Sequence, residues 1–206
     1  MSNCVFARTL LDVPYFCQAD PQWRGIPHLR PRDVQTENTI GKVGCALTSM
    51  AMIINYYADY HPDENMRNKI VKRNPLELND LLVENKWYDT VHNDIDFRYI
   101  VKVSSGAIMM TKEEEPPTDN TVNGYLKNKM PIILKVYNEK TSNSHFVVVT
   151  GSCVPLGYTI NDPGYKDNKN LGKYGNKYQD LRRFKPSDGN DNYSALSIRG
   201  YPGRKK

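Results

Sequence analysis

Cys45 has the sequence surroundings of a thiol nucleophile. It directly follows a glycine, and apolar side chains then recur at Leu47, Met50, Ala51, Ile54 and Tyr57. This spacing predicts a helix over residues 45–58 with one buried face and with Cys45 in its first turn. The unpaired N–H groups and the positive dipole at a helix N-terminus favour a thiolate over a thiol. The alternative is a small apolar residue that packs well.

His145 is the candidate base for this nucleophile. A thiolate needs a base, and the base needs a group that orients it. The other histidines, His28, His61 and His92, lie in polar stretches that indicate loops. His145 instead opens an apolar, β-branched run over residues 146–149, which predicts a buried strand with the histidine at its entry. A strand end holds a base rigidly, although a buried core histidine would give the same pattern.

Asp162 and Gln18 would complete such a site. Asp162 follows a second predicted strand, residues 158–160, and precedes a proline, which biases its backbone toward an extended conformation. If the two strands are antiparallel neighbours, Asp162 lies near His145; the alternative is a turn-forming residue before Pro-Gly. The Gln18 amide can donate a hydrogen bond to an oxyanion beside the Cys45 backbone N–H. Otherwise Gln18 is an ordinary surface glutamine.

In this order, the motifs resemble those of the papain-like cysteine peptidases, in particular the bacteriocin-processing, double-glycine-leader peptidases and their stand-alone relatives. The segments that carry the likeness are VPYFCQADPQW, TIGKVGCALTSMAMIINYY, MPIILKVY, SHFVVVTG and YTINDPGY, and they cover most of residues 11–165. The resemblance implies a papain-like α+β fold, in which a helical half with the nucleophile helix packs against an antiparallel sheet. It also implies Cys45 as nucleophile, His145 as base, Asp162 as orienting carboxylate and Gln18 as oxyanion donor.

Two features depart from the leader peptidases. The gap from Gln18 to Cys45 is longer than in the transporter-linked enzymes, and no transporter is attached, so leader processing does not carry over. The stand-alone relatives include bacterial, secreted and phage-encoded proteins, among them cell-wall hydrolases. The resemblance therefore implies a reaction type more firmly than a substrate.

The remaining patterns predict an α+β chain with helices first and an antiparallel sheet after. Further helices are expected after a capping box at 74–77 and over 121–129. Strands are expected over 13–16, 97–103, 131–137, 145–150, 158–162 and 193–199. Residues 1–10 suggest a loose lead-in, 24–40 a long polar connection and 106–120 an acidic exposed loop. We expect one peptidase-like domain over 1–206, with a core over about 11–165, a basic loop over 166–190 and a C-terminal strand and tail over 191–206.

Composition narrows the class of protein. A chain of 206 residues can bury a real core, and a charged fraction of 25% is ordinary for a folded domain. The cysteines, at Cys4, Cys17, Cys45 and Cys153, show no CxxC spacing, which argues against a zinc site and a disulfide framework. We therefore expect no metal and no cofactor.

The start of the chain, MSNCVFAR, lacks the charged start and apolar core of a signal peptide. No apolar stretch approaches the ~20 residues of a membrane span. We expect synthesis in the cytoplasm, where a thiol stays reduced. Release from the cell and incorporation into a virion both stay open.

The net charge is +5, and much of the basic excess lies in residues 166–185. The segment contains Lys166, Lys169, Lys173, Lys177, Arg182, Arg183 and Lys185, with Tyr174 and Tyr178 between them. It is a solvated loop, a contact for an anionic polymer such as cell-wall glycan, or a site for single-stranded nucleic acid. Since no nucleic-acid-binding motif is present, we expect a peptide or peptidoglycan substrate and no nucleic-acid partner.

Three classes of function follow. The first is a cysteine peptidase-type hydrolase, for which a peptidoglycan-peptide hydrolase of phage or bacterial origin would suit the size and charge. The second is a peptidase-fold structural or binding module, for example in a phage particle. The third is a transglutaminase-like acyltransferase, since water and amines can both take the acyl group from the same thioester. The complete set of Cys45, His145, Asp162 and Gln18 argues against the second class.

Overall fold

The structure is a computed structural model, and it describes residues 6–113, 118–138, 143–154, 157–175 and 178–188. The strands are β1 (Phe6–Leu10), β2 (Ile108–Glu113), β3 (Ile132–Asn138), β4 (Asn143–Val154), β5 (Gly157–Asn161) and β6 (Tyr178–Pro186). The α-helices are α1 (Ile40–Val43), α2 (Cys45–Tyr60), α3 (Glu64–Arg67), α4 (Pro75–Asn85), α5 (Ile100–Val103) and α6 (Asp119–Lys127). Two 3₁₀ turns, η1 (Phe97–Tyr99) and η2 (Leu171–Tyr174), complete the set.

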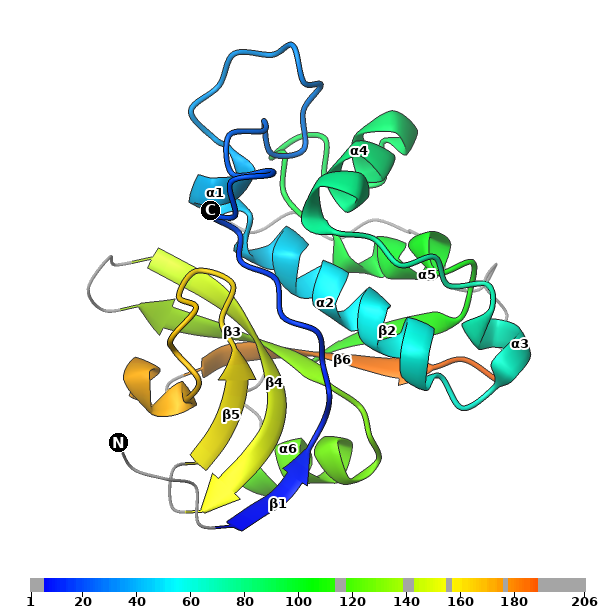
Figure 1. Cartoon of the computed structure of the whole chain (residues 1–206), viewed down its shortest axis with the longest axis vertical. Coiled ribbons are helices and arrows are strands. Elements are labelled where there is room, and N and C mark those ends of the chain that lie inside the picture. The colour runs from blue at the N-terminus through cyan, green and yellow to red at the C-terminus, as the bar shows by residue number, and fades with distance from the viewer. Residues whose placement is uncertain (1–5, 114–117, 139–142, 155–156, 176–177, 189–206) are drawn as a thin grey trace.

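The strands form one antiparallel sheet in the order β1-β4-β3-β6-β2, with β5 paired to β4 beside this path. β4 is the organising strand, because it pairs with β1, β3 and β5. Helices α2, α4 and α5 lie on one side of the molecule and the β4–β5 part of the sheet on the other (Figure 1). The predicted α+β class is therefore confirmed.

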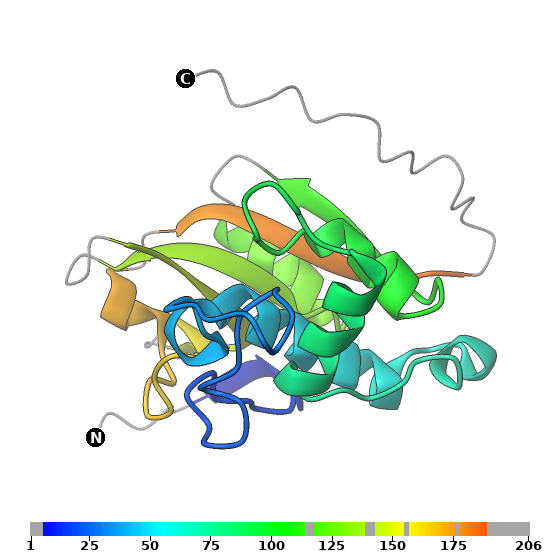
Figure 2. The ribbon, with the colours of Figure 1, turned by 90° about the horizontal axis from the view of Figure 1, so that it is seen from above.

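Helix α2 is the central helix that the apolar spacing predicts, and it begins at Cys45. Its residues 46–57 are all buried. Ser49 Oγ donates to the Phe146 carbonyl of β4 at 3.4 Å, and Tyr57 Oη donates to the Phe184 carbonyl of β6 at 2.7 Å. Seen from above, α2 lies between strands β3 and β6 on one side and the N-terminal segment on the other (Figure 2).

A sharp break separates α1 from α2 at Gly44. The Gly44 N–H donates to the Ile40 carbonyl at 2.8 Å. A Cβ at this position would lie 2.4 Å from that carbonyl oxygen, so a larger residue would push the two helices apart. The glycine therefore lets the chain turn directly before Cys45 and start a new helix there.

Helix α4 begins with the predicted capping box. Asn74 Oδ1 accepts from the Glu77 N–H at 3.0 Å, and Glu77 Oε2 accepts from the Asn74 N–H at 2.8 Å. One turn later, the buried Asn79 amide accepts from the Leu29 N–H at 2.9 Å and donates to the Pro27 carbonyl at 3.2 Å. These bonds hold the long polar connection of residues 24–40 against the helical side of the molecule.

The strands predicted at 13–16 and 97–103 are wrong. Pro14 has no N–H for a sheet ladder, so the strand lies earlier, in β1, where residues 1–10 suggested a loose lead-in. Residues 97–103 form η1 and α5 instead. Asp96 caps this turn by accepting from the Arg98 N–H, and the buried side chains of Phe97, Ile100 and Val103 recur with a helical spacing.

The two predicted loops are also shorter than expected. Residues 106–120 contain β2 and the start of α6, because Ile108 and Met109 are buried against β6. The basic loop over 166–190 contains η2 and β6, in which the Arg182 guanidinium lies 4.8 Å from the ring centre of Phe146. The predicted strand over 193–199 and the rest of 191–206 lie outside the described residues. Within the described ranges, no helix is long and apolar enough to cross a membrane.

The capping box makes a quantitative prediction for α4. Replacing Asn74 with Ala removes the acceptor for the Glu77 N–H and should lower the free energy of unfolding by about 1 kcal/mol. The measurement is the denaturant midpoint at constant m-value. Asn74→Asp keeps the acceptor and should stay near the wild type. Equal losses in both variants would show that the cap does not stabilise the helix.

Candidate active site

Two strands bring His145 and Asp162 together. The β4–β5 ladder begins at the pair Val148–Asn161, and Asp162 is the residue directly after it. From there, Asp162 Oδ1 reaches His145 Nε2 at 2.7 Å. The carboxylate has no solvent exposure, and the imidazole is 12% exposed. The antiparallel arrangement expected for these strands is confirmed.

His145 is also under the influence of Cys45. Nε2 is engaged by Asp162. Cys45 is, with Asp162, one of the two groups that raise the pKa of His145, and Nδ1 is the ring nitrogen that Asp162 does not engage. Cys45 itself is half-buried at the start of α2. Cys45 at the start of the helix and Asp162 after strand β5 therefore both act on the His145 imidazole.

Gln18 connects the same two parts of the molecule. Its backbone N–H donates to the Pro163 carbonyl at 2.8 Å, directly after Asp162. Its side-chain Nε2 donates to the Gly41 carbonyl of α1 at 2.9 Å. An amide nitrogen carries two N–H donors, so this contact orients the side chain and leaves one donor. Gln18 is buried, which rules out the ordinary surface glutamine.

Sequence reasoning missed two residues of the site, Asn168 and Tyr174. The Asn168 Nδ2 and the Tyr174 Oη each donate to Asp162 Oδ2 at 2.6 Å. The Gly164 N–H donates to Oδ1 at 3.0 Å. With His145, these groups satisfy both oxygens of the buried carboxylate. Both missed residues belong to the basic segment, where no spacing or periodicity marks them as buried.

The segment after Asp162 also packs around the imidazole. The ring centres of Tyr165 and Tyr174 lie 6.1 Å and 6.0 Å from that of His145. A Cβ on Gly164 would stand 3.0 Å from His145 Cε1, so the glycine allows the chain to approach the ring closely. These contacts leave the histidine little room to change its rotamer.

The surroundings of His145 and Asp162 keep both side chains ionised at neutral pH. Burial alone would lower the pKa of His145, but the hydrogen bonds and negative charges of Asp162 and Cys45 raise it to about 9. Burial alone would raise the pKa of Asp162, but the hydrogen bonds from His145, Tyr174 and Asn168, together with the His145 charge, hold it below its ordinary value. An imidazolium between a thiol and a carboxylate is the result.

The other three histidines have different surroundings. Burial lowers the pKa of His28 to about 4. Both ring nitrogens of His61 contact backbone carbonyls, those of Asp63 and Ala107, at 3.0 Å. His92 is exposed and contacts Asp89. Within the described residues, no group of three His, Cys, Asp or Glu side chains is placed to hold a metal ion.

A comparison with protein families matches most of the chain. Residues 10–186 match the family described as Peptidase_C39 like family. This range includes all four candidate residues and the two donors that the sequence did not reveal. No curated protein matches the chain.

The raised pKa of His145 can be measured by NMR titration of its ring protons. We expect a midpoint near 9 in the wild type and a lower midpoint in Asp162→Asn, which removes the carboxylate charge. His28, with a pKa of about 4, is an internal reference that this variant should leave unchanged. A wild-type midpoint at or below the ordinary value of 6.5 would contradict the imidazolium.

The pKa shifts of His145 and Asp162 also determine how the free energy of unfolding changes with pH. Because the folded pKa of His145 is raised, its contribution is complete below pH 6.5 and is lost as the pH rises through about 9. Because the folded pKa of Asp162 is lowered, its contribution is present above the ordinary value of 3.8 and is lost as the pH falls below it.

Proposed function

Because the chain belongs to the Peptidase_C39-like family, we propose that it is a papain-like cysteine peptidase that cleaves a peptide or amide bond through an acyl-enzyme on Cys45. The observation that carries the proposal is the 2.7 Å bond from His145 to the fully buried Asp162. A buried carboxylate bonded to a histidine, whose pKa a cysteine at a helix N-terminus also raises, is what an activated thiol nucleophile requires. The papain-like arrangement, with one peptidase-like domain, belongs to the same proposal.

The proposed residues account for each step. The Cys45 thiolate attacks the carbonyl carbon, and its negative charge passes to the carbonyl oxygen. The free N–H of Gln18 Nε2 and the backbone N–H of Cys45 stabilise that oxyanion. The His145 imidazolium then gives its proton to the leaving amine, and the thioester remains. His145, now neutral, takes a proton from water, the hydroxide displaces the thiolate, and a carboxylic acid is released.

The proposed substrate is a peptide, and the first substrate to test is the peptide part of cell-wall peptidoglycan. The family supports peptidase chemistry, and the basic charge of the chain, +5, suits an anionic cell wall. A panel of peptides and purified cell walls, with mass spectrometry of the acyl product in the presence of an added amine, distinguishes hydrolysis from acyl transfer. Hydrolysis generates a free carboxylate, whereas transfer to an added amine generates an amide.

The site residues predict an order of losses in turnover. Cys45→Ala should abolish hydrolysis, and His145→Ala should cost nearly as much, since the members of a triad act as a unit. Asp162→Asn should cost less than either, because it keeps a hydrogen-bond acceptor beside the histidine. The matched control is Cys17→Ala, since Cys17 is also a free cysteine, and this variant should keep full activity. An active His145→Ala enzyme would refute the pairing.

Gln18 makes a separate prediction. One oxyanion donor is worth on the order of 100- to 1000-fold in turnover. Gln18→Ala should therefore lower kcat by about this factor while KM changes little. Circular dichroism and thermal melting check that the variant keeps its fold, since Gln18 also contacts Gly41. A rise in KM at unchanged kcat would instead make Gln18 a ground-state contact to substrate.

A further inference from the structure

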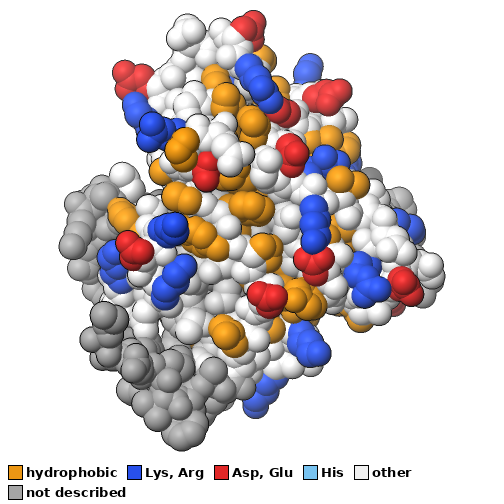
Figure 3. All heavy atoms as spheres, in the orientation of Figure 1, with side chains coloured by type: hydrophobic (Ala, Val, Ile, Leu, Met, Phe, Trp, Pro, Cys, Tyr) orange, Lys and Arg blue, Asp and Glu red, His pale blue; other side chains and the backbone are white. Residues whose placement is uncertain are grey.

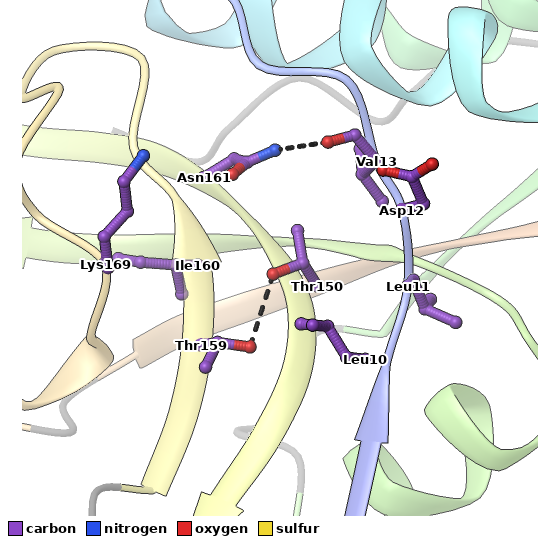
Figure 4. A pocket seen from close by; sticks show the side chains of 9 residues that line it. All are labelled: Leu10, Leu11, Asp12, Val13, Thr150, Thr159, Ile160, Asn161 and Lys169. Atoms are coloured by element: carbon purple, nitrogen blue, oxygen red, sulfur yellow. Dashed lines mark hydrogen bonds between the residues drawn. The ribbon is translucent and has the colours of Figure 1, made fainter. Parts of the chain in front are cut away.

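A pocket of about 570 Å³ opens beside the proposed catalytic site, between the segment after β1 and strands β4 and β5 (Figure 4). Leu10, Leu11, Val13 and Ile160 give it apolar walls, and Thr150 and Thr159 add hydroxyl groups. The two hydroxyls lie 3.3 Å apart. Such a mixture of apolar surface and a few polar groups is typical of a site for a small organic group.

The pocket and the buried carboxylate share the same short segments of chain. Asn161 lines the pocket and donates to the Val13 carbonyl at 2.9 Å, and the next residue is Asp162. Lys169 also lines the pocket, and the residue before it, Asn168, donates to Asp162. A ligand in the pocket would therefore contact the direct sequence neighbours of Asp162 and of its donor Asn168.

The two ends of the pocket carry opposite charges. Lys169 stands at one side, with its ammonium group 4.4 Å from the ring centre of Tyr15. Asp12 stands at the other side, where its carboxylate accepts from Tyr60 Oη at 2.8 Å (Figure 4). On the same face, apolar side chains run across the middle with lysine and arginine side chains on both sides of them (Figure 3).

A second lysine is fixed in the same way, next to the histidine. The Lys173 ammonium group lies 4.7 Å from the ring centre of Tyr165, and Tyr165 itself packs edge-on against His145. A cation held over an aromatic ring is already positioned before a ligand arrives. Lys169 and Lys173 are therefore two positive charges held over aromatic rings within the segment that follows Asp162.

We propose that this pocket binds a segment of the substrate peptide that carries a carboxylate, and that Lys169 pairs with that carboxylate. This inference rests on the proposed peptidase function and names its substrate class. The apolar walls take the carbon chain of the bound segment, and Asp12 accepts an N–H or amine at the other end. Selection of acidic peptides is the consequence.

Two observations favour a peptide over a nucleic acid or another uniform polyanion. Asp12 would repel negative charge at its end of the pocket. The tyrosine rings near the pocket already carry a lysine, Lys169 over Tyr15 and Lys173 over Tyr165, so those ring faces are not open platforms for stacked bases.

The test compares two fluorogenic peptides that differ by Glu against Gln near the cleaved bond. We expect wild-type kcat/KM to be about tenfold higher for the Glu peptide at low salt, and the preference to shrink above ~0.15 M salt. Lys169→Gln should remove the preference, and Lys169→Arg should restore it. The matched control is Lys102→Gln on α5, since Lys102 also lies over aromatic rings, those of Trp87 and Tyr99, and this variant should keep the preference.

Binding of the Glu and Gln peptides to the Cys45→Ala variant, measured by fluorescence anisotropy, tests this inference separately from the proposed function. Tighter binding of the Glu peptide that depends on Lys169 supports the pocket even if the wild type cleaves neither peptide, a result that would refute the peptidase. Equal cleavage and equal binding of the two peptides would overturn the pocket assignment. An equal loss of the Glu preference in Lys169→Gln and Lys102→Gln would also overturn it. The same holds if an oligonucleotide competes with the bound peptide as strongly as unlabelled Glu peptide does.

Discussion

The Asp162 carboxylate is the interaction on which the rest of the site depends. A carboxylate without solvent exposure is costly to bury as an ion unless donors replace the lost water. His145, Gly164, Asn168 and Tyr174 supply those donors from β4 and from the segment after β5. The carboxylate in turn fixes each of these groups. The position of the imidazole and the path of the chain around it therefore depend on the same carboxylate.

The segment 162–175 has two sides with different tasks. Its inner side carries the donors to Asp162, among them Asn168 and Tyr174, both of which are buried. Its outer side carries Lys169 and Lys173, whose ammonium groups rest on aromatic rings. A single stretch of chain thus couples the electrostatics that orient the histidine to the charges that a substrate would meet.

Local signals in the sequence were enough to predict the elements that carry Cys45 and His145. Helical periodicity predicts α2 from Cys45 onward, and the capping box predicts α4, because both patterns depend on neighbours within a few turns. The proximity of His145 to Asp162 follows from two adjacent antiparallel strands. Residues 97–103 were misassigned because a short apolar segment fits a strand and a helix equally well.

The rest of the site depends on contacts that no local pattern encodes. Gln18 reaches Gly41 and Pro163 across loops, and the burial of Tyr174 among basic residues depends on the carboxylate that it meets. A polar side chain in a charged segment has the same sequence signal whether it faces solvent or a buried ion. The role of such residues can be identified only from the folded structure, in which the sheet places Asp162 next to them.

The order of these residues along the chain has a consequence for synthesis. Tyr15 Oη donates to the Asp162 carbonyl across 147 positions, and the last donor to the carboxylate is Tyr174. A growing chain on the ribosome therefore holds Cys45 long before it holds the residues that orient His145. Cys45 is made early, but the groups proposed to make it a nucleophile come together only when the sheet closes, so the proposed activity depends on folding of nearly the whole chain.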